Sequence, residues 1–341
     1  MPKHLLSLWL LWYAYPFSTH IGILHTRLLC RYFSFSRGIF CRPEHYATYA
    51  AFLRHKTLRL LLPYVIFSLI NYVYWLLVAR HFGADADPDV SLTLPLLGIL
   101  FGFEPWMYFY KPLWFLPCLM VTEILFYSLW RLSTALHKAY LLPLFAFGLS
   151  AIGNSLSCMC VPPLPFALGG VLTMMLFYYL GYFFASRKNT ICSLFAVQTV
   201  SSWYLVVIAL VFAAICGVLS LQTATTSVHK NSYGNALFAL PTALCGCLAL
   251  SCIAILIAKL PPLRLLQYIG THTLVIFGIH LTVASLIKGF TVFVCQLPLS
   301  TYERLGVRFL LVIATVFCSL PFCFLYDKIV SSKRFFTKSS K

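Results

Sequence analysis

Residues 192–218 read CSLFAVQTVSSWYLVVIALVFAAICGV, a stretch of 27 residues without one charged side chain. A helix rises about 1.5 Å per residue, so about 20 apolar residues are enough to cross the roughly 30 Å of hydrocarbon in a bilayer. A helix built from this stretch is apolar on every face, which indicates burial in lipid or in a large core. We therefore predict a transmembrane helix here.

Similar apolar runs recur along the 341-residue chain, in which 61% of the residues are hydrophobic and 10% are charged. Soluble domains carry about 25% charged residues, so no soluble core could bury this much apolar surface. The pattern argues against a transmembrane barrel, whose strands alternate apolar and polar residues. The predicted fold class is all-α, a polytopic transmembrane helix bundle with about 8–10 spans.

The net charge of +17 would suggest a nucleic-acid partner in a soluble protein, but here the basic residues fall in the loops between apolar runs. The 13 cysteines lie mostly within apolar runs and lack the CxxC repeats of zinc or redox sites. The sequence has no Gly-rich phosphate loop and no set of metal ligands. These patterns argue against soluble cofactor enzymes, metal centres and nucleic-acid binders.

The charges between the apolar runs predict the topology. Cytoplasmic loops carry an excess of Lys and Arg, and basic loops alternate here with acidic or nearly uncharged ones. This alternation places both the region before residue 57 and the basic tail in the cytoplasm. A shorter apolar stretch, Leu92 to Phe103, predicts an interfacial or re-entrant segment. The eight spans predicted from residue 57 onward are 58–79, 112–130, 139–156, 166–186, 192–218, 235–258, 271–289 and 306–326.

The first fifty residues follow a different pattern. Leu5 to Phe17 is an apolar run of about thirteen residues, and Arg27, Arg31 and Arg37 then fall within a short stretch. Each central Arg costs a membrane helix roughly 2.5–3.5 kcal/mol, so this segment predicts a poor span. We divide the chain into a divergent or damaged region at 1–50 with at most one span, a membrane domain at 51–330 and a basic tail at 331–341.

Ionisable residues inside predicted spans are the first candidates for chemistry, because burying them in a membrane is costly. Glu123 is the one carboxylate within a predicted span, and it either serves a site or bonds across the bundle in protonated form. His280 lies in the middle of its span and is either a site residue or a neutral imidazole bonded to a helix neighbour. Lys288 fits a side chain that extends to the interface.

Arg54, His55, Lys56 and Arg59 form a basic cluster just before an apolar span. Lys56 and Arg59 are three residues apart, so on an α-helix they would share a face. The cluster is either the positive-inside anchor of that span or a clamp for a phosphorylated ligand, since Arg and Lys both bind phosphate oxygens.

Four motifs in the chain resemble those of a known family. They are Lys56-Thr-Leu-Arg59-Leu-Leu-Leu-Pro63-Tyr64, Pro112-Leu-Trp114-Phe115-Leu116-Pro117, Phe177-Tyr178-Tyr179-Leu-Gly181-Tyr182, and Tyr268-Ile-Gly270-Thr-His-Thr-Leu274 followed by Ile279-His280. In this order and spacing they resemble the acyltransferase-3 membrane proteins, in particular the branch similar to fucose 4-O-acetylases.

The resemblance implies a ten-helix membrane fold that moves an acyl group, usually acetyl from acetyl-CoA, to a hydroxyl of a sugar or glycan. A histidine would act as base, with His25 and His20 as the first candidates and His280 as a secondary one. Lys56, Arg59, Arg54 and Trp114 would bind the acyl-CoA. The implied partners are acyl-CoA, a glycan or lipid-linked sugar and membrane lipid. No permanently bound cofactor, metal or nucleic acid is expected, and the implied location is a bacterial cytoplasmic membrane.

The sequence departs from the family pattern before residue 50. The family places two spans there, the first bearing the histidine, whereas Ser36-Arg37-Gly38-Ile39-Phe40 looks like a damaged Ser-Gly-x-x-Phe end of the second. We therefore hypothesise that the segment before about residue 38 is truncated or read out of frame. Two other functions stay open, a transporter or flippase for a lipid-linked sugar and a non-catalytic partner in glycan assembly.

Overall fold

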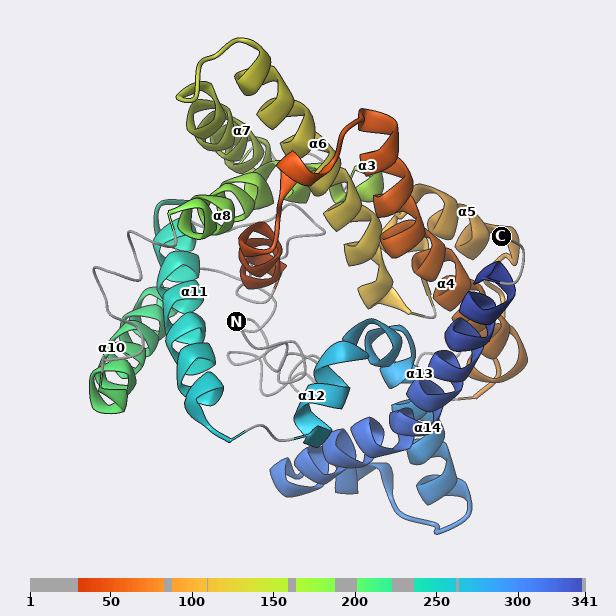
Figure 1. Cartoon of the computed structure of the whole chain (residues 1–341). Coiled ribbons are helices and arrows are strands. Elements are labelled where there is room, and N and C mark those ends of the chain that lie inside the picture. Colours follow the sequence, from red (N-terminus) through yellow and green to blue (C-terminus); the bar gives the residue numbers. More distant parts are fainter. Residues whose placement is uncertain are drawn as a thin grey trace. The chain divides into compact units, whose positions relative to one another are not determined.

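The computed structural model describes residues 30–82, 88–108, 110–158, 164–187, 201–222, 236–261 and 264–338. Helices make up most of these ranges, and none of the residues in them forms a strand (Figure 1). The predicted all-α fold is confirmed. Besides a helical segment at residues 30–39, the α-helices are α3 (Tyr49–Lys56), α4 (Leu62–Tyr74), α5 (Thr93–Phe101), α6 (Phe115–Ala135), α7 (Leu141–Cys158), α8 (Leu168–Ser186), α10 (Ser202–Leu221), α11 (Ala236–Lys259), α12 (Arg264–Thr271), α13 (Thr273–Phe293) and α14 (Leu305–Lys338).

Within the described ranges, seven helices are long and apolar enough to cross a membrane, and Leu141–Leu156 is a shorter apolar helix. Together they correspond one for one to the eight predicted spans, so the chain is a multi-pass membrane protein. Large apolar side chains stay exposed along α10 and α14, as expected where helices meet lipid. The seven long helices are Tyr49–Ala79, Lys111–Ala135, Pro165–Ser186, Ser202–Leu221, Phe238–Lys259, Thr273–Phe293 and Gly306–Lys328.

The helix Tyr49–Ala79 contains a widened π-helical turn at Thr57–Leu61, between α3 and α4. Pro63 follows this turn at the start of α4. A proline has no N–H to bond the carbonyl four residues earlier, and its ring crowds that carbonyl, which here belongs to Arg59. The wider turn relieves this crowding and changes the direction of side chains before it relative to those after it.

The stretch predicted to be interfacial or re-entrant contains the short helix α5. Gly102 ends the helix in the left-handed conformation, with φ of 54°, which a glycine adopts at little cost. A Cβ on Gly102 would also lie 3.0 Å from side-chain atoms of Pro117 and Phe166. The helix is nine residues long, which is too short to cross a bilayer, as the length of the apolar stretch predicts.

The chain divides into two compact units, the larger within Thr19–Lys259 and the smaller including the chain from Leu260 onward. In the larger unit α7 and α6 pack against α8, and α10 packs along α11 (Figure 1). In the smaller unit α13 packs against α14 and α12 against α13. The domain boundary predicted near residue 50 stays a prediction.

The helical segment 30–39, which carries two of the three arginines, is packed into the larger unit. The segment crosses α8 at close range where Gly38 meets Gly181. A Cβ on Gly38 would lie 2.0 Å from the Tyr178 carbonyl oxygen, and a Cβ on Gly181 would lie 1.9 Å from the Phe35 carbonyl oxygen. Phe35 and Phe177 share an apolar cluster with Ala243 and Cys247 of α11. Small residues allow two backbones to approach this closely, as in membrane helix pairs.

Arg31 of the same segment is buried and donates from Nη1 to the Ala239 carbonyl oxygen of α11 at 2.9 Å. Its guanidinium also lies 5.6 Å from the centre of the Phe177 ring. A buried arginine is tolerated where its donors meet acceptors. The charge of Arg31, which the sequence analysis counted as a cost to insertion, therefore has partners on α11 and α8.

Candidate active site

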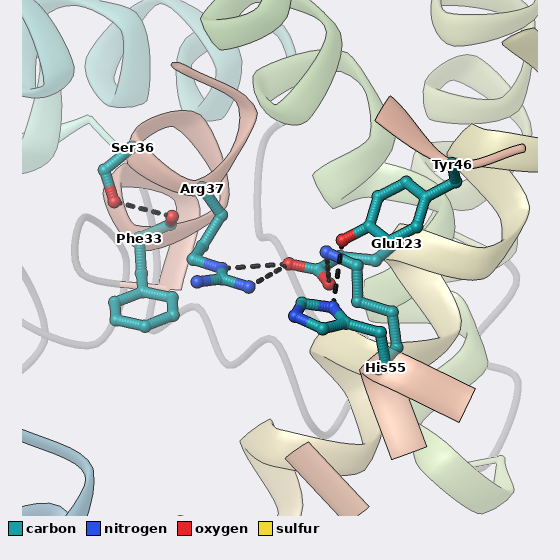
Figure 2. A network of polar contacts seen from close by, with 7 residues as sticks. Phe33, Ser36, Arg37, Tyr46, His55 and Glu123 are labelled. Carbon is teal, nitrogen blue, oxygen red and sulfur yellow. Dashed lines mark hydrogen bonds and ion pairs between the residues drawn. The ribbon is translucent and has the colours of Figure 1, made fainter. Parts of the chain in front are cut away.

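The centre of the site is Glu123, halfway along α6, whose side chain is 1% exposed. A carboxylate at such a position is costly unless cations and donors meet it. Two cations from other segments do so. Arg37 of the helical segment 30–39 approaches from one side, and Lys56 at the end of α3 completes the group, which we call the Glu123 cluster (Figure 2).

Arg37 binds one oxygen of the carboxylate with two donors. Its Nε lies 2.9 Å and its Nη2 2.6 Å from Oε1 of Glu123. Charge-assisted hydrogen bonds of this kind are among the strongest in proteins. The sequence left open a protonated Glu123 bonded across the bundle, and in the structure the carboxylate bonds across helices to charged partners instead.

Lys56 binds the other oxygen, with Nζ 2.7 Å from Oε2 of Glu123. The lysine is the last residue of α3. It is 7% exposed as a whole residue, and its ammonium also lies over the ring of Phe52. Arg54 and Arg59 are exposed. Lys56 is buried, whereas Arg59 is exposed and lies within the π-helical turn at Thr57–Leu61. The predicted shared face assumed α-helical spacing, which this turn interrupts ahead of Pro63.

Tyr46 and His55 form a second polar group beside the Glu123 cluster. The hydroxyl of Tyr46 lies 2.9 Å from Nδ1 of His55, an exposed residue of α3 (Figure 2). The Tyr46 ring packs edge-on against Phe52 and Tyr127, and these two rings stack with centroids 3.9 Å apart. Burial, followed by the charge of Glu123, raises the pKa of Tyr46 above its ordinary value of 10, so its phenol stays protonated at neutral pH.

Cys41 and Tyr178 lie next to the cluster without carrying charge into it. Burial raises the pKa of the Cys41 thiol to about 11, and a hydrogen bond joins it to Tyr178. Thiols this far from ionisation are poor nucleophiles. Cys41 therefore has a packing role, in an apolar cluster that also contains Phe126 and Met175.

The described ranges hold no group of three or more His, Cys, Asp or Glu side chains that could bind a metal ion. They do hold a His–Asp pair in the smaller unit, where Nε2 of His272 lies 2.8 Å from Asp327 and Nδ1 lies 2.9 Å from the Tyr268 carbonyl oxygen. Both ring nitrogens face oxygen acceptors. This histidine therefore links α12 to α14 and has no free nitrogen for taking a proton from a substrate.

A comparison with known protein families shows which family this chain belongs to. The acyltransferase-3 family model, described as an acyltransferase domain, matches residues 5–327. This chain belongs to the acyltransferase-3 family. Neither a curated protein nor a solved structure matches the chain. Family membership and the apolar helices together make the protein a membrane acyltransferase.

The acyltransferase-3 match begins before the arginines of the first fifty residues and takes in both compact units. The segment read as a damaged second span is thus within the matched region, and its helix from residue 30 onward supplies Arg37 to the Glu123 cluster. The match does not distinguish branches, so the likeness to fucose 4-O-acetylases stays a prediction.

The other residues implied by the acyltransferase-3 resemblance lie apart from one another along the chain. Trp114 is 3% exposed at the entry to α6 and meets Phe115 edge-on. His280 is buried in α13 of the smaller unit, where Nδ1 donates to the Phe277 carbonyl oxygen at 3.0 Å. This is the helix-neighbour bond that the sequence analysis considered. His20 and His25 lie outside the described residues.

Sequence reasoning missed Arg37 as a site residue. It treated the arginine as a cost to membrane insertion and treated Glu123 separately, although one buried carboxylate and one arginine in apolar surroundings are natural partners. Searching for a cation for Glu123 would have favoured Arg37, Arg31 and Lys56. The choice among them needs the packing of the segment 30–39 against α8.

Proposed function

We propose that this membrane acyltransferase moves an acyl group, in the simplest case acetyl, from acyl-CoA to a hydroxyl of a sugar or surface glycan. The observation that carries the proposal is the family match along residues 5–327, which supports acyl transfer as the reaction class. The likeness of the four motifs to fucose 4-O-acetylases makes a fucose-containing glycan the first acceptor to examine.

Exposed arginines at the start of the span Tyr49–Ala79 support acyl-CoA as donor. Arg54 and Arg59 are both exposed, while Lys56 between them is held by Glu123. A guanidinium presents a planar fork of donors that suits the phosphates of CoA. In this proposal Arg54 and Arg59 bind the phosphates, Lys56 anchors the helix that carries them and Trp114 lines the path of the acyl group.

The chemistry needs no resident metal or cofactor, because a thioester is already activated. A base takes the proton of the acceptor hydroxyl, the hydroxyl oxygen attacks the thioester carbon, and the C–S bond breaks to release CoA, which takes up a proton. Histidine suits this role near neutral pH. His25 and His20 are the candidates from the resemblance, His280 is a secondary one, and His55, which is held by Tyr46, is a further candidate from the geometry.

We place the protein in a bacterial cytoplasmic membrane, with the basic end of the span Tyr49–Ala79 and the C-terminus in the cytoplasm. The excess of Lys and Arg in alternate loops supports this orientation. Acyl-CoA is then available on the side where Arg54 and Arg59 are exposed.

The test is transfer of labelled acetyl from acetyl-CoA to surface glycan by membranes that contain this chain. We expect label in the glycan and stoichiometric release of CoA. Arg59→Ala tests the proposed phosphate contact. Arg131→Ala is its matched control, because Arg131 is an exposed arginine on α6. Absence of transfer by the unaltered chain to any glycan, with the protein present and folded, would remove the proposal.

A further inference from the structure

The Glu123 cluster holds one positive charge too many. Arg37 and Lys56 both bind Glu123, and within the described residues neither cation forms an ion pair with a second carboxylate. The side chains of all three are mostly buried, at 18%, 9% and 1% exposure for Arg37, Lys56 and Glu123. An unbalanced charge in such surroundings is costly, so a further partner of negative charge would stabilise it.

Lys56 alone would neutralise Glu123, so charge balance does not require Arg37. A one-to-one pair between Lys56 and Glu123 needs no third member, and an arginine is costly in an apolar helix. Charge balance within the cluster therefore leaves the presence of Arg37 unexplained. Arg37 must contribute something that the Lys56–Glu123 pair lacks.

The donor that Arg37 contributes is Nη1. Its Nε and Nη2 atoms are both held by Oε1 of Glu123, whereas no described residue hydrogen-bonds to Nη1. A guanidinium is planar, so two held nitrogens fix the direction of the third. Arg37 is also the most exposed side chain of the three. The cluster thus presents a fixed N–H donor with excess positive charge behind it.

We infer that Nη1 of Arg37 donates to the oxygen of the acyl carbonyl as that oxygen becomes negative during transfer. The inference rests on the proposed function and adds a catalytic residue to it. When the acceptor hydroxyl attacks, the electron pair of the C=O bond moves to oxygen, and Arg37 stabilises this oxyanion. The pair then re-forms C=O as the C–S bond breaks, so the charge leaves with the CoA thiolate, which is protonated.

A preorganised donor in partly dry surroundings is suited to this task, because it needs no reorientation when the charge appears. The oxyanion also supplies the missing negative charge of the cluster at the step where stabilisation accelerates the reaction. The CoA phosphates are a poorer match, since Arg37 lies mostly buried beside Glu123 whereas Arg54 and Arg59 are open to solvent.

The test is the kinetics of acetyl transfer by purified Arg37→Gln protein in detergent or nanodiscs, with CoA release and acetylated glycan both measured. This variant keeps the Lys56–Glu123 pair, so no buried charge is left unpaired. We expect kcat to fall by about 100-fold or more, the usual effect of losing one oxyanion donor, with KM for acetyl-CoA within about threefold of the unaltered chain.

Arg37→Lys is the second variant, because it keeps the positive charge and covers the case in which Arg37→Gln does not fold. The single ammonium would be held by Glu123 and lacks the fixed third nitrogen, so we expect kcat to stay far below that of the unaltered chain. A kcat within threefold of the unaltered chain in either folded variant would overturn the inference. If the unaltered chain itself transfers nothing, the proposed function fails and the inference with it, so the two failures are distinguishable.

Discussion

Nζ of Lys56 lies 2.7 Å from Oε2 of Glu123, which ties the end of α3 to the middle of α6. A lysine that the family resemblance assigns to acyl-CoA binding thus faces inward. The arginines on either side of it are the exposed members of the same basic cluster. In our proposal, structural and binding roles are therefore divided among neighbouring residues of one helix.

This division can be tested on stability. Lys56→Met removes one of the two ion pairs of Glu123 but leaves Arg37 in place, so we expect a loss of about 1.5–3 kcal/mol in unfolding free energy. Thermal unfolding of the purified protein in detergent is the measurement. Arg54→Met is the matched control, since Arg54 is exposed on the same helix and should shift the midpoint little. Equal shifts in the two variants would contradict the inward role of Lys56.

The exposed Arg59 should affect the binding of acyl-CoA without affecting the stability of the protein. We expect Arg59→Ala to raise KM for acyl-CoA by about tenfold, which corresponds to the loss of one charge-assisted hydrogen bond of about 1.4 kcal/mol. Thermal unfolding should stay unchanged. Steady-state kinetics over a range of acyl-CoA concentrations measures this, and Arg131→Ala is the control. An unchanged KM in Arg59→Ala would remove Arg59 from the donor site.

The glycine crossing should be the least tolerant point of the larger unit. A Cβ on Gly181 would lie 1.9 Å from the Phe35 carbonyl oxygen, so Gly181→Ala must push the helical segment 30–39 away from α8. We expect a strongly lowered unfolding temperature and poor accumulation in membranes. Gly217→Ala in α10 is the control, because nothing lies within 4 Å of its added methyl group and helix propensity favours alanine by up to about 1 kcal/mol. Tolerance of Gly181→Ala at full stability would contradict the packing.

Thiol reactivity reports on the environment of Cys41. Its raised pKa of about 11 leaves almost no thiolate at pH 8, and reactivity should rise with pH because ionisation becomes easier as the pH approaches that pKa. We expect slow maleimide labelling of a variant whose one cysteine is Cys41, and fast labelling of a variant whose one cysteine is the exposed Cys295. Mass spectrometry over time at pH 7 and pH 9 measures both. Similar rates for the two variants at pH 7 would show that Cys41 is accessible and ionised.

The spans were predictable from sequence because their signal is local. Length, composition and loop charge predict each apolar helix without knowledge of its neighbours, and the stretch that holds α5 was predicted from its length to be too short to span. Even the shorter helix Leu141–Leu156 matches a predicted span. These features depend on transfer from water to lipid, which acts on each segment separately.

The Glu123 cluster was not predictable because its members are far apart in the chain. Arg37 and Glu123 are 86 positions apart, and Arg37 alone looks like a cost. Lys56 is followed by a π-helical turn that interrupts the α-helical spacing on which the sequence prediction relied, and Pro63 is the one local signal of that turn. The role of Gly38 becomes visible only beside the backbone of Tyr178.

The distance between Arg37 and Glu123 along the chain has a consequence for how the protein is made. The segment 30–39 is synthesised before α6, and the carboxylate that binds Arg37 follows 86 residues later. Until α6 arrives, Arg37 has no buried anion to meet and is better kept in water or among lipid headgroups. The segment 30–39 then reaches its final place only after a helix that is synthesised later, so assembly of the membrane domain departs in part from the order of translation.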